Sequence, residues 1–123
     1  TGVQTCALPI CSILTAIGND YRFEDVFAKQ VKALGAEGDV ACGISTSGDS
    51  PNVIAAILAA KRCGLATIGM TGRGGALAEA ADLVLTVDSG VTARIQEAHI
   101  TMGHILCELV DRILFPETFA HAT

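Results

Sequence analysis

One stretch, residues 38–52, constrains the fold of this 123-residue chain more than any other. It begins with a short apolar run at 40–44 and changes abruptly to a run rich in serine and threonine at 45–50. After Pro51 it becomes a long Ala/Ile/Leu segment with helical spacing. That order predicts a strand, a hydroxyl-rich turn and the start of a helix, because Pro suits the first helical turn and Ser50 suits the N-cap.

The turn, which we call the serine loop (residues 45–50), is a candidate anion site. It gathers the hydroxyls of four residues: Ser45, Thr46, Ser47 and Ser50. These hydroxyls lie beside the free N–H groups of the predicted helix N-terminus. Such an arrangement binds anions, most often phosphate, and the helix dipole adds to the attraction. The alternative is a turn in which the hydroxyls only cap the helix and meet solvent. Four hydroxyls in six residues exceed what a cap needs, so the loop predicts a phosphate site.

Strands and helices alternate along the chain. The pattern predicts strands at 12–17, 39–44, 65–70 and 82–87, and helices at 22–34, 52–63, 76–81 and 92–115. This alternation favours an α/β fold, with an open parallel sheet of about four strands and flanking helices. Such sheets bind ligands at the carboxyl ends of their strands, where three polar or glycine-rich loops are expected, at 18–20, 45–50 and 71–75. Neither a dinucleotide fingerprint nor a P-loop motif is present in the sequence.

The composition argues against several classes of function. A net charge of −5 argues against a nucleic-acid partner held by phosphate contacts. No apolar stretch is long enough to span a bilayer, so we expect a soluble, cytoplasmic protein without a membrane partner. The five cysteines include no CxxC pair, and we expect them to be reduced and not to form a metal site.

The two ends of the chain differ from its middle. Residues 1–11 have no periodic pattern and resemble read-through of a sequencing adapter, so we interpret them as a non-native leader. The native protein would then begin earlier. Residues 12–116 are expected to form a partial α/β domain, and residues 117–123 to fray.

The last predicted helix, residues 92–115, is apolar around much of its girth. We therefore expect it to be buried by its own sheet and by a partner chain. Gln96 and His104 lie on one i, i+4, i+8 row, about 12 Å apart along the helix axis. His104 is either a hydrogen-bonded core histidine or a base or metal ligand, and spacing alone favours the core histidine. His99 and His121 are expected on the surface.

Four stretches together resemble a known family: LTAIGND at 14–20, DVACGISTSGDS at 39–50, MTGRGG at 70–75 and RIQEAHITMGHIL at 94–106. The chain resembles the SIS (sugar isomerase) domain proteins and, among them, the phosphoheptose isomerases. With its spacing, the resemblance covers nearly all of residues 12–115. It implies a SIS-type, flavodoxin-like three-layer sandwich that lacks its N-terminal helix and first strand.

The resemblance implies a role for each matching residue. The family's phosphate-holding loop matches Ser45, Thr46, Ser47 and Ser50. A substrate-contacting pair matches Asn19 and Asp20. Gln96 matches a residue that touches substrate and zinc, and His104 matches a zinc ligand and the proposed acid/base.

The reaction that the resemblance implies is an aldose–ketose isomerisation. It converts sedoheptulose 7-phosphate to D-glycero-D-manno-heptose 7-phosphate through an enediol, toward the heptose precursors of bacterial lipopolysaccharide. A group must remove a proton and return it, which a neutral imidazole can do near pH 7, and a zinc ion could polarise the carbonyl. The resemblance implies a homotetramer with sites at the subunit interfaces and, in metal-bound members, one zinc ion per subunit.

One part of the family pattern has no counterpart in this sequence. Family members begin with a helix, a first strand, a Gly-Asn-Gly-Gly-Ser-type loop and a helix that carries a His and a Glu. Gln96 and His104 are therefore two of four expected zinc ligands. We expect this stretch alone to bind zinc poorly and to be inactive.

Two other functions fit the same family. The DnaA initiator-associating proteins are non-catalytic binding tetramers, and residues 28–35 and 107–116 are similar to theirs. The resemblance implies that those proteins alter the serine loop and lack a His at position 104, so Ser47 and His104 favour the isomerase. The other possible function is that of a regulatory SIS domain, which senses a sugar phosphate. Such domains usually lie beside a helix-turn-helix, which this sequence does not show.

Overall fold

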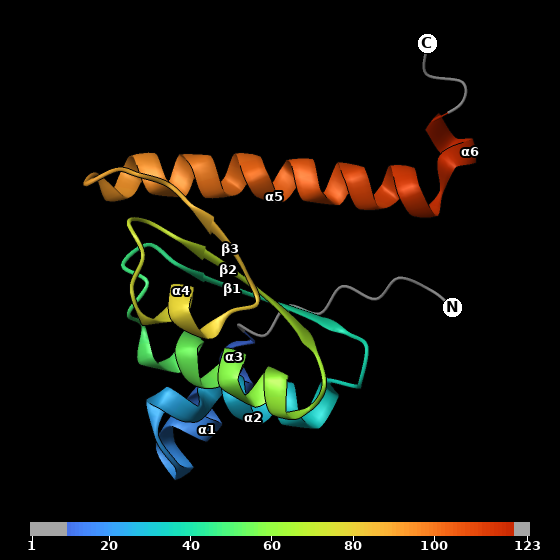
Figure 1. Cartoon of the computed structure of the whole chain (residues 1–123). Coiled ribbons are helices and arrows are strands. Elements are labelled where there is room, and N and C mark those ends of the chain that lie inside the picture. Colours follow the sequence, from blue (N-terminus) through green and yellow to red (C-terminus); the bar gives the residue numbers. More distant parts are fainter. Residues whose placement is uncertain (1–9, 120–123) are drawn as a thin grey trace.

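The computed structural model describes residues 10–119. A three-stranded sheet has several helices on one face and one long helix on the other (Figure 1). The elements are α1 (Cys11–Asp20), η1 (Phe23–Asp25), α2 (Val26–Leu34), β1 (Val40–Ser45), α3 (Pro51–Arg62), β2 (Ala66–Thr71), α4 (Ala76–Ala80), β3 (Leu83–Thr86), α5 (Thr92–Leu114) and α6 (Pro116–Phe119). Most of the predicted leader, residues 1–9, and His121 lie outside the described residues.

The predicted α/β class, the parallel sheet and the flanking helices are confirmed, and one predicted strand is wrong. Residues 12–17 belong to helix α1, so the described sheet has three strands. A short apolar run cannot be assigned to strand or helix by periodicity alone. In the structure, the half-buried residues of this run are 13, 14 and 17, which is the spacing of one helix face.

The three strands are parallel and in the order β1-β2-β3. Each strand aligns its last residue with that of its neighbour: Ser45 pairs with Thr71, and Thr71 pairs with Thr86. The carboxyl ends therefore lie side by side at one edge. The serine loop and the segment at 71–75, which we call the glycine loop, both leave the sheet at this edge.

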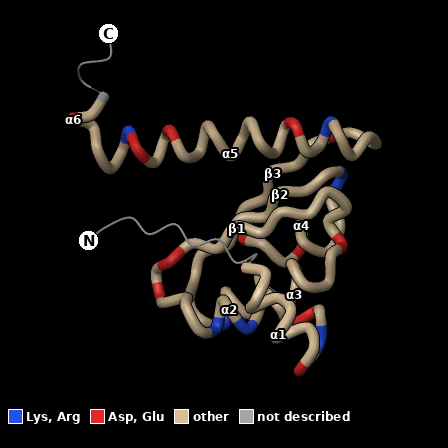
Figure 2. Tube along the Cα trace, turned by 180° about the vertical axis from the view of Figure 1, so that it is seen from behind, with Lys and Arg blue, Asp and Glu red and all other residues tan. Residues whose placement is uncertain are grey.

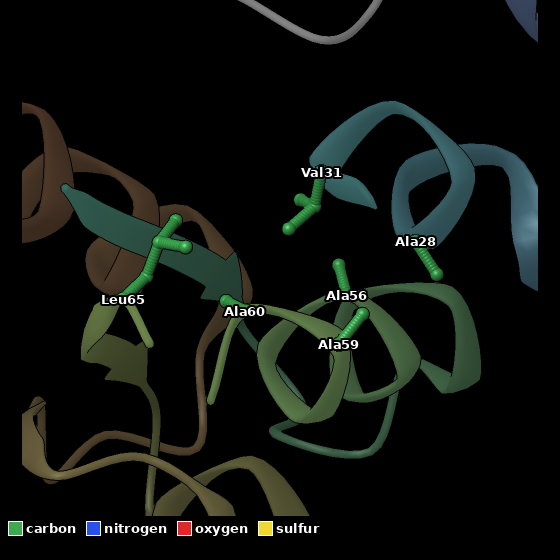
Figure 3. Packing of buried hydrophobic residues seen from close by; sticks show 6 residues of the cluster. All are labelled: Ala28, Val31, Ala56, Ala59, Ala60 and Leu65. Atoms are coloured by element: carbon green, nitrogen blue, oxygen red, sulfur yellow. The ribbon is translucent and has the colours of Figure 1, made fainter. Parts of the chain in front are cut away.

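Small residues let helices approach the sheet and one another closely. A Cβ atom added to Gly43 of β1 would lie 2.9 Å from the side chain of Val53 on α3, so only glycine fits there. Between α2 and α3 the buried cluster consists mostly of alanine side chains (Figure 3): Ala28, Val31, Ala56, Ala59, Ala60 and Leu65. This close packing fixes α3, and with it the helix N-terminus that follows the serine loop.

The other face of the sheet is covered by α5 at one end only. The buried residues of α5 are Ile95 and His99, both near its start. Beyond them the helix continues past the sheet toward α6 (Figure 1). Its middle, residues 98–107, carries no charged side chain, and charges lie toward both ends (Figure 2). Several apolar side chains between its middle and its C-terminal end are exposed: Ile100, Ile105, Leu109, Ile113 and Leu114.

The C-terminal tail, which was expected to fray, begins with a short helix, α6. Pro116 ends α5, and its fixed φ suits the first turn of a new helix. Its remainder lies outside the described residues. Within residues 10–119, no helix is both long and apolar enough to cross a membrane.

Candidate functional site

Three serine side chains meet where β1 ends. The Ser45 Oγ lies 2.8 Å from the Ser50 Oγ and 3.3 Å from the Ser47 Oγ. The backbone N–H of Gly48 donates to the Ser45 Oγ at 3.2 Å, and that of Asp49 donates to the Ser47 Oγ at 3.2 Å. The predicted serine loop is therefore a compact cluster of hydroxyls around Ser45, which is buried.

The helix that follows begins as predicted, with Ser50 at the N-cap and Pro51 in the first turn of α3. The Ser50 side chain makes no capping hydrogen bond and instead contacts Ser45. The backbone N–H groups of Ser47 and Ser50 donate no hydrogen bond within residues 10–119. The loop thus presents unused N–H donors and hydroxyls beside the positive end of a helix dipole, which is an arrangement that can bind an anion.

The serine loop is hydrogen-bonded to the glycine loop and to the start of α4. The Gly72 N–H donates to the carbonyl of Thr46 at 3.1 Å, and the Leu77 N–H donates to the carbonyl of Gly48 at 2.8 Å. The Ala76 N–H donates to the Asp49 Oδ1 at 2.9 Å. These three bonds hold the loop in shape without a ligand, so little ordering would be needed for an anion to bind.

Two glycines allow the loops to come this close. Gly48 has a φ of +76°, and a Cβ atom added to it would lie 1.7 Å from the carbonyl oxygen of Gly74. Gly75 has a φ of +91°, and its added Cβ would lie 2.7 Å from the backbone of Gly48. Only glycine avoids both the steric overlap and the strain of the left-handed region.

Gln96 lies close to the same edge of the sheet. It lines a hollow of about 400 Å³ between the end of β1 and α5, together with Ile44, His99, Ile100 and Gly103. Ile44 directly precedes Ser45, so the structure brings Gln96 into the neighbourhood of the serine loop.

The two histidines of α5 exchange their expected environments. His104 is exposed, which contradicts the core-histidine alternative for that residue. His99, expected on the surface, is 5% exposed, and its Nε2 lies 3.0 Å from the carbonyl oxygen of Thr71. The reason is that the row through Ile95 and His99 faces the sheet, and the row through Gln96 and His104 does not. The sequence holds no local signal that separates the two, because each histidine has an isoleucine four positions before it, Ile95 or Ile100.

Asn19 and Asp20 do not lie in a loop at a strand end, so the prediction for residues 18–20 is wrong. They are the last two residues of α1, both exposed, and the Asn19 Nδ2 donates to the Asp20 Oδ1 at 2.9 Å. Helix α1 packs against η1 and α2, and both views place α3 between it and the sheet (Figures 1 and 2). A substrate contact by this pair stays a prediction.

The described chain does not by itself supply a zinc site. No group of three or more His, Cys, Asp or Glu side chains within residues 10–119 could hold a metal ion. Gln96 and His104 are about 12 Å apart along the axis of α5. Since protein zinc sites use three or four ligands, further ligands would have to come from outside these residues.

The carboxylate whose pKa departs furthest from its usual value lies away from the serine loop. The Lys61 ammonium, 2.9 Å away, and hydrogen bonds from Thr67 lower the pKa of Asp82 to about 2. Asp82 precedes β3, and Thr67 lies near the start of β2. This group therefore links α3 to the amino ends of the strands and has a structural role.

The fold is that of a SIS domain. The sequence matches the SIS domain family over residues 4–72, more than half of the 123-residue chain, and the chain belongs to that family.

Several similar proteins are phosphoheptose isomerases. The chain is 58% identical to the phosphoheptose isomerase of Nitratidesulfovibrio vulgaris (strain Hildenborough) over 110 residues, 89% of this chain and 53% of the relative. It is 60% identical to that of Roseiflexus sp. over 107 residues, 86% of this chain and 54% of the relative. The solved structure of phosphoheptose isomerase GmhA from Neisseria gonorrhoeae is similar with a TM-score of 0.79 and 52% identity, over 81% of this chain and 57% of that one. The chain thus spans about half the length of these relatives.

Proposed function

We propose that the protein containing this chain is a sugar-phosphate isomerase that interconverts sedoheptulose 7-phosphate and D-glycero-D-manno-heptose 7-phosphate. The observation that carries the proposal is the serine loop, a preformed cluster of hydroxyls and unused N–H groups at the start of α3. The names of the relatives support the reaction. They do not favour a non-catalytic initiator-binding protein or a sugar-phosphate sensor.

The serine loop would bind the phosphate of the substrate. The N–H groups of Ser47 and Ser50, together with the hydroxyls of the four loop residues, offer several donors to one dianion. The four residues are Ser45, Thr46, Ser47 and Ser50. Each hydrogen bond to a charged group contributes about 1.5–3 kcal/mol, or roughly a tenfold to hundredfold change in affinity. Since the phosphate is remote from the reacting carbons, this binding positions C1 and C2.

Helix α5 would supply the chemistry. A neutral His104 can remove a proton from C1 of the ketose and return it to C2, while a hydroxyl proton moves from O1 to O2. The Gln96 amide can donate to and accept from the oxygens that change bond order. Gln96 lines the hollow beside Ile44, and His104 lies two turns further along the helix.

The same helix would also be an assembly surface. Ile113 is 75% exposed, and Ile105 and Leu109 are about half exposed. Exposed apolar side chains at i, i+4 and i+8 form a continuous stripe on a helix. We infer that α5 packs against other copies in a homotetramer and that the protein is cytoplasmic.

The test uses the complete protein and follows conversion of sedoheptulose 7-phosphate by NMR. We expect turnover by the wild type, a KM at least tenfold higher in the Ser47→Ala/Ser50→Ala double variant, and a kcat at least a hundredfold lower in His104→Ala. The matched control is Ser12→Ala, which removes an exposed hydroxyl on α1. A wild type without turnover, or a double variant with an unchanged KM, would refute the proposal.

A further inference from the structure

Helix α5 is held against the sheet by two side chains. Ile95 and His99 are its buried residues, and Ile95 packs on Gly72 of the glycine loop, where an added Cβ would lie 2.9 Å from the Ile95 Cδ1. Among residues 92–111 of α5, His99 is the one whose side chain hydrogen-bonds outside the helix within the described chain. The helix therefore has one apolar and one polar point of attachment.

The acceptor of the His99 hydrogen bond is the Thr71 carbonyl, which also accepts a bond from the segment after β3. The carbonyl oxygen of Thr71 accepts from the His99 Nε2 at 3.0 Å and from the backbone N–H of Val87 at 3.0 Å. Thr71 itself is fully buried, at the end of β2 and opposite Ser45 and Thr86. A single hydrogen bond thus ties α5 to the edge of the sheet from which the serine loop leaves.

The partner of His99 determines which nitrogen carries the proton. A carbonyl oxygen only accepts, so the Nε2 must be the protonated nitrogen. The Nδ1 is buried and has no hydrogen-bond partner within the described residues. An N–H there would be a buried donor without an acceptor, which costs about 1–3 kcal/mol, so the tautomer with a bare Nδ1 is favoured.

His99 lies one turn after Gln96. Both residues line the hollow next to Ile44; the His99 side chain is buried and that of Gln96 is exposed. If the His99–Thr71 bond were lost, α5 could shift along or rotate over the end of β2, and Gln96 would move with it. The serine loop would stay in place, because its own bonds are to the glycine loop and α4.

We propose that His99, as the Nε2–H tautomer bonded to the Thr71 carbonyl, is a positioning residue that holds Gln96 in register with the serine loop. This inference rests on the proposed function, since Gln96 and the serine loop act on one substrate. It concerns how the two halves of the site are aligned, and it assigns no proton transfer to His99.

Three substitutions in the complete protein separate positioning from folding. His99→Leu removes the donor and replaces the ring with an apolar side chain that can fill the buried position. His99→Gln can place an amide N–H near the position of the Nε2. Thr101→Ala is the control, because Thr101 is exposed on the same helix and bonds only within it.

We expect His99→Leu to lower kcat about tenfold to a hundredfold with less than a threefold change in KM, because misplacement by 1 Å can cost about a hundredfold in rate. His99→Gln should restore most of kcat.

The ring nitrogens supply a readout that does not depend on turnover. Long-range ¹H–¹⁵N correlation spectra at pH 8 should show the His99 ring protonated at Nε2 and bare at Nδ1, with the resonances assigned by their loss in His99→Gln. A ring protonated at Nδ1 would overturn the inference, as would a His99→Gln variant as slow as His99→Leu or a loss confined to KM.

The outcomes also distinguish this inference from the proposed function. A wild type without turnover refutes the function, and with it the role of His99 in aligning the site. A wild type with turnover, together with a His99→Leu variant as active as Thr101→Ala, refutes the positioning role alone.

Discussion

Replacing Gly48 by alanine tests how the serine loop keeps its shape. The new Cβ would lie 1.7 Å from the carbonyl oxygen of Gly74, and real Cβ atoms almost never come within 3.0 Å of such an atom. The two loops would have to separate by about 1.3 Å. Separation on that scale breaks the Leu77–Gly48 hydrogen bond and weakens the Gly72–Thr46 and Ala76–Asp49 bonds.

The loss of stability in Gly48→Ala can be estimated from the three hydrogen bonds and the backbone strain. Three hydrogen bonds at about 1 kcal/mol each amount to roughly 3 kcal/mol. A residue with a Cβ in the left-handed region adds about 1–2 kcal/mol. We therefore expect Gly48→Ala to lower the free energy of unfolding by roughly 4 kcal/mol and to raise the KM for the sugar phosphate at least tenfold.

A second glycine provides the control. Gly38 also has a positive φ, +89°, but an added Cβ there would meet nothing within 4 Å. Gly38→Ala should therefore show only the backbone strain, about 1–2 kcal/mol, and an unchanged KM. Urea denaturation and steady-state kinetics on both variants measure the difference. Equal losses of stability, or an unchanged KM in Gly48→Ala, would refute the reasoning.

Three further predictions concern other contacts. Asp49→Ala should destabilise the protein by about 1 kcal/mol in urea denaturation because it removes the acceptor for the Ala76 N–H, whereas Asp49→Asn keeps an oxygen there. The ion pair with Lys61 and its hydrogen bonds hold the pKa of Asp82 at about 2, so its contribution to stability is complete above its ordinary value near 4 and is lost as the pH falls toward 2. The free energy of unfolding, measured as a function of pH, should not show this acid-dependent loss in the Asp82→Asn variant. Ile113→Glu should reduce the assembled mass in sedimentation velocity, because it places a charge on the exposed apolar stripe of α5.

Each of these predictions has an outcome that contradicts it. Equal stability of Asp49→Ala and Asp49→Asn would mean that the carboxylate does not hold the start of α4. An unchanged acid transition in Asp82→Asn would remove Asp82 as its cause. Cys107→Glu is the control for the assembly experiment, because Cys107 is exposed and lies on the opposite side of α5 from the row of Ile105 and Leu109. Equal effects of Cys107→Glu and Ile113→Glu would show that the stripe is not the contact surface.

The strand, turn and helix around the serine loop could be predicted because their signals are local. Pro51 and Ser50 occupy the predicted N-terminal positions of α3, and β1 and β2 follow their apolar runs. The hydroxyl cluster could be anticipated as a gathering of side chains in one turn. Its internal geometry could not, because the Gly48–Gly74 approach joins two loops that are distant in the sequence.

The errors arise where more than one local structure satisfies the pattern. Residues 12–17 are apolar enough for a strand, yet they pack as one face of α1. Because residues 12–17 were predicted to be a strand, Asn19 and Asp20 were predicted to lie at its end. In the structure they lie at the end of helix α1. Periodicity over six residues does not distinguish the two forms; contacts with η1 and α2 do.

The amino-acid sequence by itself determines the α/β class of this protein, the position of the serine loop before a helix, and the family to which the chain belongs. Local propensities, capping residues and motif spacing carry that information along the chain. The tertiary structure alone decides which row of α5 faces the sheet. A helix with apolar residues on several sides has no single inward stripe, so docking of Ile95 on Gly72 and of His99 on Thr71 selects one. That choice buries His99, leaves His104 exposed and brings Gln96 to the hollow beside β1.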